Sequence, residues 1–239
     1  MLDPVVAYDR LAPHYSQFSN RRAAYLRSVE AHIQSRIPAG AASLLDIGAG
    51  DGSRTLRIAA AANLFRVVLL EPSSGMRSAL PECAELWPVR CEAVQVSNIS
   101  QRFDVITCLW NVLGHVQGAP TRARALGVAA ELLSPGGLLF VDVIHRYNLP
   151  SYGLVMTAAR WLRDQLAPSD TSGDVVDKWQ TAAGEIKAYG HVFADREVRK
   201  LAESAGLECL ERIVIDYETG ATRRVGCLGN LLYVFRRSS

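Results

Sequence analysis

The sequence lacks three features that would each point to a particular class of protein. Its 26 Lys and Arg residues nearly balance 24 Asp and Glu residues, so it has no basic surplus for holding nucleic acid through phosphates. No apolar stretch approaches the roughly 20 residues that span a bilayer. The N-terminus MLDPVVAYDRLAPHY has no apolar region of a signal peptide. We expect a cytoplasmic protein without a membrane or nucleic-acid partner.

The sequence also lacks any cysteine pattern that would mark a metal site or a disulfide framework. Its five cysteines form no CxxC pair and no Cys/His cluster with zinc-like spacing. An odd number of cysteines without a framework fits a reducing compartment. We therefore expect no metal. The length of 239 residues suits a single α/β domain with appendages.

Short apolar runs recur at regular intervals and alternate with helix-forming stretches. The runs are SLLDI (43–47), RVVLLE (66–71), EAVQV (92–96), FDVITCLW (103–110) and LLFVDVI (138–144). This alternation predicts a parallel sheet covered by helices on both faces. Two further runs, 207–218 and 229–237, have no helix between them and predict a hairpin, which adds one antiparallel strand near the C-terminal edge.

Two segments lie outside this alternating pattern. Residues 1–40 hold a short helix or ordered arm over 3–18 and an amphipathic helix over 20–37. Residues 146–190 hold a helix, a polar loop and a short turn or helix, and no strand is expected there. Because this long connection follows the last parallel strand, we interpret it as a lid over the site.

A glycine loop, LLDIGAGDGS, follows the first predicted strand. Gly48, Gly50 and Gly52 let the backbone approach a ligand closely, and the next helix begins there. A dinucleotide site would have a third glycine where Ser53 stands, and a P-loop would need GxxxxGK[ST], which is absent. Asp46 favours S-adenosylmethionine (SAM), whose ammonium group a carboxylate can attract. Glu71, at the end of the next strand, can bind a ribose diol, as it also would in an NAD site.

Taken together, the motifs resemble those of class I SAM-dependent methyltransferases. LLDIGAGDG resembles their first motif, LLEPSSGM their second strand and ribose acid, FDVITCLWNVLGHV their fourth-strand motif, and LLSPGGLLFVDV the fifth. The resemblance implies a Rossmann-like three-layer α/β sandwich with a mostly parallel seven-stranded sheet. It implies an arm (1–40), a core (41–145 and 191–239) and the 146–190 insertion. It implies SAM as cofactor and S-adenosylhomocysteine (SAH) as product, at Tyr15, Asp46, Gly48, Ala49, Gly50, Glu71, Pro72, Met76, Ser97, Asn98, Leu109 and Trp110.

The fourth-strand motif is most similar to that of enzymes acting on amino-sugar nitrogens and of glycine N-methyltransferase-like enzymes. In the amino-sugar group, a histidine after the same glycine lies near the acceptor, which implies a catalytic role for His115. An imidazole suits proton transfer at neutral pH. Candidate acceptor contacts are Tyr25, Asn111, His145 and Tyr152.

The acceptor is expected to be a small molecule, methylated on N or O. The NPPY-type tetrapeptide of enzymes that methylate nucleic-acid amino groups is absent, and LWNV stands in its place. Three alternatives stay open: an RNA methyltransferase, a SAM-binding protein that does not methylate, and an NAD-binding oxidoreductase. The protein is expected to be a monomer or a homodimer.

Overall fold

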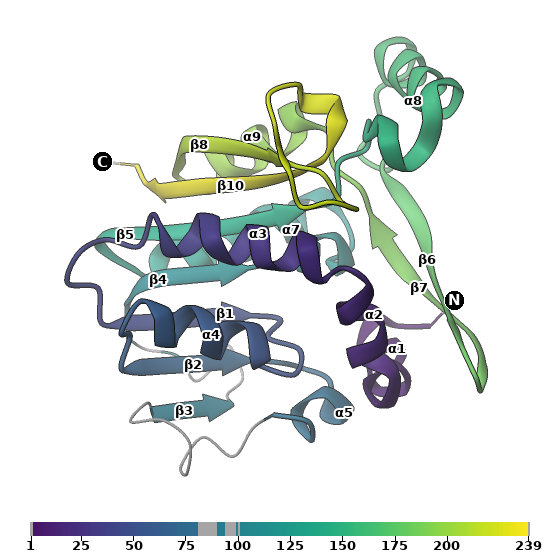
Figure 1. Cartoon of the computed structure of the whole chain (residues 1–239). Coiled ribbons are helices and arrows are strands. Elements are labelled where there is room, and N and C mark those ends of the chain that lie inside the picture. Colours follow the sequence, from purple (N-terminus) through teal and green to yellow (C-terminus); the bar gives the residue numbers. More distant parts are fainter. Residues whose placement is uncertain (1, 81–89, 94–98, 100, 239) are drawn as a thin grey trace.

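The structure is a computed structural model that describes residues 2–80, 90–93, 99 and 101–238 (Figure 1). One central sheet has the strand order β3-β2-β1-β4-β5-β10-β8-β9. Strands β1 to β5 run parallel, and β10 is antiparallel to both of its neighbours. The strands are β1 (Ser43–Ile47), β2 (Arg66–Leu70), β3 (Arg90–Ala93), β4 (Phe103–Cys108), β5 (Leu133–Val143), β8 (Leu207–Ile215), β9 (Thr222–Arg223) and β10 (Asn230–Arg237). Apart from the two-residue β9, this is the predicted sheet with its reversed strand, and the fold class is confirmed.

Helices cover both faces of the sheet (Figure 1). Helices α3 (Ala23–Gln34) and α4 (Ser53–Ala61) cover one face, and α7 (Ala119–Glu131) and α9 (Asp195–Ser204) cover the other. Neighbouring residues of one strand divide between the two cores: Leu44 packs with the first pair of helices and Leu45 with the second. Burial on both faces explains why these strands are uninterrupted apolar runs in the sequence.

The N-terminal arm is helical and lies across the carboxyl ends of the strands (Figure 1). It contains α1 (Pro4–Leu11), a 3₁₀ turn (Ala12–His14) and α2 (Tyr15–Arg21). Asp9 Oδ1 accepts hydrogen bonds from Gly75 N at 2.8 Å and Ser73 Oγ at 2.7 Å, in the turn around α5 (Ser74–Arg77). On the other side, Leu2 N donates to Lys187 O at 2.9 Å. The arm is therefore held at two points, Leu2 and Asp9.

The expectation that 146–190 contains no strand is wrong. The segment begins with α8 (Leu149–Leu166), kinked at Gly153, and continues with the hairpin β6 (Asp174–Thr181) and β7 (Gly184–His191). Strand β6 is exposed or half-buried along its whole length, so no apolar run marks it. Strand β7 is buried at Ile186 and from Ala188 onward, and both residues pack against α1.

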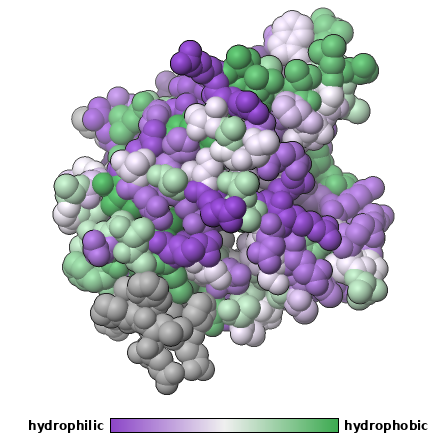
Figure 2. Space-filling view, in the orientation of Figure 1, coloured by the Kyte–Doolittle hydropathy of each residue, from purple (hydrophilic) through white to green (hydrophobic). Residues whose placement is uncertain are grey.

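Helix α8 projects from the body and buries only Asp164. Its exposed large apolar side chains are Leu154, Val155, Met156, Trp161, Leu162 and Leu166. Figure 2 shows green groups at the upper right, where α8 lies. Within the described ranges, no helix is long and apolar enough to cross a bilayer. The predicted strand 92–96 is described only up to Ala93, and the helix expected around Met76 is the single turn α5.

Candidate active site

Two adjoining cavities lie at the carboxyl ends of the parallel strands. The glycine-loop cavity, of about 460 Å³, is bounded by the loop after β1, the ends of β2 and β4, and α1. The hairpin cavity, of about 280 Å³, is bounded by α1, α2 and strand β6. Four side chains line both cavities and form the partition between them: Tyr8, Tyr15, Trp110 and His115. The carboxyl ends of strands are the usual ligand position in open α/β sheets.

The glycine loop leaves no room for side chains. At Gly48 the φ angle is +74°, and a Cβ atom would lie 2.5 Å from Val112 Cγ2. At Gly50 the φ angle is +61°, and a Cβ atom would lie 3.0 Å from the Tyr15 hydroxyl. A side chain at either position would be strained and would narrow the cavity. Both glycines line the glycine-loop cavity, as do the predicted residues Tyr15, Glu71, Pro72, Leu109 and Trp110.

Glu71 is held at the rim of β2 by backbone donors. Its Oε2 accepts from Gly50 N at 2.8 Å and its Oε1 accepts from Ser73 N at 2.8 Å. Burial raises the pKa of Glu71 above its usual value, and the two backbone hydrogen bonds oppose that rise. Each carboxylate oxygen retains a free lone pair, so Glu71 can still accept hydrogen bonds from a ligand diol.

Asp46 lies behind the loop and does not line the cavity. It is 1% exposed, and it accepts hydrogen bonds from the Thr55 hydroxyl and, at 2.7 Å, from the Thr107 hydroxyl. Burial raises its pKa. Met76 is fully buried and Ala49 packs in the core, so neither is among the lining residues. The remaining predicted cofactor contacts, Ser97 and Asn98, lie outside the described residues.

Arg54 is a residue of the glycine-loop cavity that the sequence analysis missed. Arg54 is the second residue of α4, and its side chain lines the cavity. Its Nη1 is buried without a hydrogen-bond partner among the described residues. An unpartnered buried guanidinium nitrogen is costly, and an anionic ligand group would satisfy it. The only sequence signal was an arginine two residues after the last glycine of the loop.

The residues after β4 form a strained turn. Trp110 and Asn111 have φ angles of 55° and 65°, a left-handed conformation that side chains such as Trp rarely adopt. Asp142 holds the turn, because its Oδ2 accepts from Trp110 N at 3.0 Å and its carbonyl accepts from Asn111 N at 2.9 Å. Tyr25, which is 1% exposed, donates its hydroxyl to Asp142 Oδ1. Tyr25 therefore braces this turn and lines neither cavity.

His115 ends the 3₁₀ helix Val112–His115 and has two defined partners. Its Nδ1 lies 3.1 Å from Tyr189 O and its Nε2 lies 3.0 Å from the Tyr8 hydroxyl. Because a carbonyl oxygen can only accept, the Nδ1 carries the proton, and Nε2 of the neutral ring accepts from Tyr8. Asp177 Oδ2 lies 3.9 Å from Nδ1. Burial raises the pKa of Asp177, and His115 opposes that rise when its ring is protonated.

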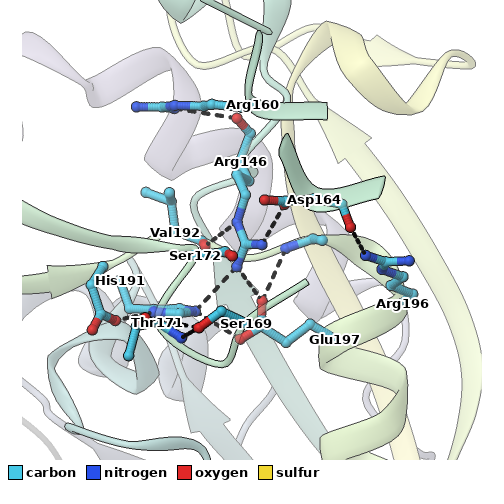
Figure 3. A network of polar contacts seen from close by, with 12 residues as sticks. Arg146, Arg160, Asp164, Ser169, Thr171, Ser172, His191, Val192, Arg196 and Glu197 are labelled. Atoms are coloured by element: carbon cyan, nitrogen blue, oxygen red, sulfur yellow. Dashed lines mark hydrogen bonds and ion pairs between the residues drawn. The ribbon is translucent and has the colours of Figure 1, made fainter. Parts of the chain in front are cut away.

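A network of buried charges fixes the β6–β7 hairpin to the core (Figure 3). Arg146 donates to Asp164 Oδ2 at 2.6 Å and to Glu197 Oε2 at 2.5 Å. His191 lies between Glu197, at 2.7 Å from Nε2, and Asp174, at 2.6 Å from Nδ1. Glu197 belongs to α9, whereas Arg146 and His191 flank the insertion.

Arg122 connects this network to the partition. It is fully buried, and its Nη2 donates to the Tyr189 hydroxyl at 2.6 Å. The carbonyl oxygen of Tyr189 in turn accepts the hydrogen bond from Nδ1 of His115. The position of His115 thus depends on the hairpin, and the hairpin on the buried charges.

Among the predicted acceptor contacts, only Asn111 lines the hairpin cavity. Its amide is already occupied, since Nδ2 donates to His191 O at 3.1 Å and Oδ1 accepts from Ile144 N at 3.1 Å. His145 is 5% exposed, and Tyr152 lies under Arg160 at 4.1 Å; neither lines the two cavities. Ten further residues line the hairpin cavity and were not predicted from the sequence: Tyr8, Leu11, Phe18, Arg21, Arg22, Ile144, Asp177, Lys178, Trp179 and Tyr217.

No group of three or more His, Cys, Asp or Glu side chains within the described part of the chain is arranged to hold a metal ion. The features of the site are a glycine loop, a carboxylate at the end of the second strand and a partition of aromatic side chains with one histidine. In a Rossmann-like sheet with one reversed strand, these features are those of a SAM-dependent methyltransferase.

Comparison with known proteins identifies the family. A family model described as "Methyltransferase domain" matches residues 11–212, and the chain belongs to this family of SAM-dependent methyltransferases. A ubiquinone biosynthesis O-methyltransferase of Coxiella burnetii is 27% identical over 191 residues, which cover 78% of this chain and 72% of the relative.

Two solved structures share the fold. The CcbJ methyltransferase from Streptomyces caelestis superimposes with a TM-score of 0.64 at 20% identity, over 89% of this chain and 90% of that one. SAM-bound CalS10, an amino pentose methyltransferase from Micromonospora echinaspora, gives a TM-score of 0.57 at 18% identity, over 94% of this chain and 96% of that one.

Proposed function

We propose that this enzyme transfers the methyl group of SAM to a nitrogen or oxygen of a small molecule bound in the hairpin cavity. The observation that carries this proposal is the partition: the two cavities adjoin, and Tyr8, Tyr15, Trp110 and His115 line both. A donor in one cavity and an acceptor in the other would meet at these side chains. The C. burnetii relative is named as an O-methyltransferase of ubiquinone biosynthesis, and CalS10 is named as an amino pentose methyltransferase. Both names agree with a small acceptor.

The glycine-loop cavity fits SAM through three observations. The loop has no side chains at Gly48 and Gly50. The carboxylate of Glu71 has lone pairs free to accept hydrogen bonds from a ribose diol. The unpartnered Nη1 of Arg54 could donate to an anion such as the methionine carboxylate. Asp46 would act on the ammonium group through the loop rather than by direct contact. When bound, SAM would supply an activated methyl group. The acceptor's lone pair would form the new bond to the methyl carbon as the carbon–sulfur bond breaks and its electron pair stays on sulfur.

The residues of the partition would orient the acceptor and take its proton. His115 Nε2 is the unprotonated nitrogen, so it can receive the acceptor's proton directly or through the Tyr8 hydroxyl. The ring then becomes a cation, and the Asp177 carboxylate at 3.9 Å stabilises it. Holding the acceptor in line with the methyl group supplies much of the rate acceleration. The arm and the hairpin exclude water from the site.

The test is transfer of labelled methyl groups from SAM to a library of small hydroxyl and amino compounds, with bulk tRNA in a parallel reaction. We expect a labelled small molecule from the wild type and far less from H115N, while both bind SAH equally. Labelling of tRNA alone would favour an RNA methyltransferase, and SAH binding without any labelled product would favour a SAM-binding protein that does not methylate.

A further inference from the structure

The hairpin cavity has an excess of positive charge. Its charged lining residues are Arg21, Arg22 and Lys178 against the single carboxylate of Asp177, which lies beside His115. Arg22 is compensated by an ion pair with Glu218 and lies 4.4 Å from the centre of the Tyr217 ring. Within the described ranges, Arg21 and Lys178 form no ion pair. Both side chains are exposed, so two cations from separate elements, α2 and β6, border the cavity without an ion pair of their own.

The neighbourhood of Lys178 supports this interpretation. Lys187 stands directly across the hairpin from Lys178. Glu185 forms its ion pair with Lys187, at 2.6 Å, and this contact lowers the pKa of Glu185 more than the charge of Lys178 does. Lys187 does not line the cavity. The hairpin thus pairs the lysine outside the cavity and leaves the lysine at the cavity available for a ligand.

Flat rings make up most of the remaining wall. The aromatic side chains that line the hairpin cavity are Tyr8, Tyr15, Phe18, Trp110, Trp179 and Tyr217. Two pairs of them meet edge to face, with Tyr15 and Trp110 at 5.8 Å and Tyr8 and Trp179 at 5.7 Å between ring centres. Such walls favour planar ligands. The volume of about 280 Å³ lies below the range of about 300–1,000 Å³ typical of drug-sized ligands, which indicates a molecule with one ring.

We infer that the acceptor is a planar, single-ring molecule that carries a carboxylate or phosphate besides the hydroxyl or amino group that is methylated. Arg21 and Lys178 bind the anionic group and so determine specificity, while His115 meets the reacting hydroxyl or amine at the partition. This inference rests on the proposed function, because it assigns the hairpin cavity to the acceptor.

The experiment is titration of the SAH-loaded enzyme with three compounds that differ only in charge. They are 3,4-dihydroxybenzoate, 3,4-dihydroxybenzyl alcohol and 3,4-dihydroxybenzylamine. We expect the anion to bind up to about 5-fold more tightly than the alcohol, since a charge pair near the surface contributes up to about that factor, and the amine to bind most weakly. A second titration of 4-hydroxybenzoate against 4-hydroxyphenyl phosphate distinguishes a carboxylate from a phosphate as the natural anion.

The double variant R21Q/K178Q is expected to lose the preference for the anion, so that benzoate and alcohol bind within about 2-fold of each other. The matched control K187Q, on the same hairpin but outside the cavity, is expected to keep the wild-type preference. SAH affinity and thermal midpoint, measured on all variants, show that the site is folded.

Equal or tighter binding of the amine, an unchanged preference in R21Q/K178Q, or no binding of any of the three compounds would overturn the inference. These results are distinguishable from failure of the proposed function, which would appear as absence of SAH binding by the wild type or as absence of any labelled small molecule in the transfer assay.

Discussion

The Tyr8 hydroxyl lies 3.0 Å from Nε2 of His115, and these two residues are 107 positions apart in the chain. The contact joins the N-terminal arm to the turn after β4 at the partition between the two cavities. It also gives His115 a hydroxyl partner on the nitrogen that is free to take a proton. The two side chains are therefore expected to act as a unit.

Replacing both residues tests this unit. H115N is expected to lower kcat by about 10²-fold or more, within the range for loss of a general base, and Y8F by about 10-fold. If the pair acts together, Y8F/H115N turns over no more slowly than H115N alone. Steady-state rates with the acceptor found in the library screen give these values. Additive losses in the double variant would show that the residues act independently.

Gly114 is expected to fix the position of His115. A Cβ atom there would overlap Asn111 Nδ2 and lie 2.5 Å from His191 O, so G114A must push the 3₁₀ helix away from β7. A displacement near 1 Å can cost up to about 100-fold in rate, so we expect kcat to fall at least about 10-fold. The control is G127A on α7, where a Cβ atom meets nothing within 4 Å and activity stays at the wild-type level. A fully active G114A enzyme would contradict this role.

The charge network of Arg146 is expected to dominate the stability of the hairpin. R146M removes the guanidinium nearest to the buried carboxylate of Asp164 and to Glu197. It leaves them only the longer contacts with Arg163 at 3.2 Å and Arg122 at 3.7 Å. We expect a loss of about 3 kcal/mol in the free energy of unfolding, the low end for breaking a buried pair. R199M removes an exposed helical ion pair with Asp195 and should cost about 0.3–0.5 kcal/mol. Urea denaturation measures both. Similar losses in the two variants would mean that the network adds nothing beyond a surface pair.

His145 is expected to weaken the fold in mild acid. Burial lowers the pKa of His145 from 6.5 to about 4, so between these values the unfolded chain binds a proton that the native protein does not. Stability contributed by the neutral ring is thus present above pH 6.5 and is lost as pH falls toward 4. The loss between pH 7 and pH 5 is about 2 kcal/mol. In H145Q this part of the pH dependence should disappear; an unchanged profile by urea denaturation would refute the assignment.

The parallel sheet and the glycine loop could be predicted from the sequence because both depend on local signals. Buried parallel strands are continuous apolar runs, and glycines such as Gly48 and Gly50 are required by backbone conformation and close packing. Glu71 was predictable for the same reason, since it directly follows a strand.

The acceptor side could not be predicted in the same way. Asp177 and Lys178 lie on a strand with no apolar face, and the position of Asp177 beside His115 depends on a hairpin held by distant charges. Tyr25 was expected at the acceptor from the resemblance to the family, and His145 from its place beside the insertion. In the structure both residues are buried. Tyr25 donates its hydroxyl to Asp142 in the turn after β4, and the backbone of His145 donates to Asn230 at the start of β10. Tertiary contacts of this kind leave no periodic pattern in one sequence.

The most direct test of the account is calorimetric titration of the enzyme with SAH, with NAD as the parallel ligand and E71A as the variant. We predict micromolar binding of SAH, no binding of NAD, and at least about 10-fold weaker SAH binding by E71A, since the diol loses a charged acceptor. Binding of NAD alone, or wild-type SAH affinity in E71A, would contradict the assignment of the glycine-loop cavity to SAM.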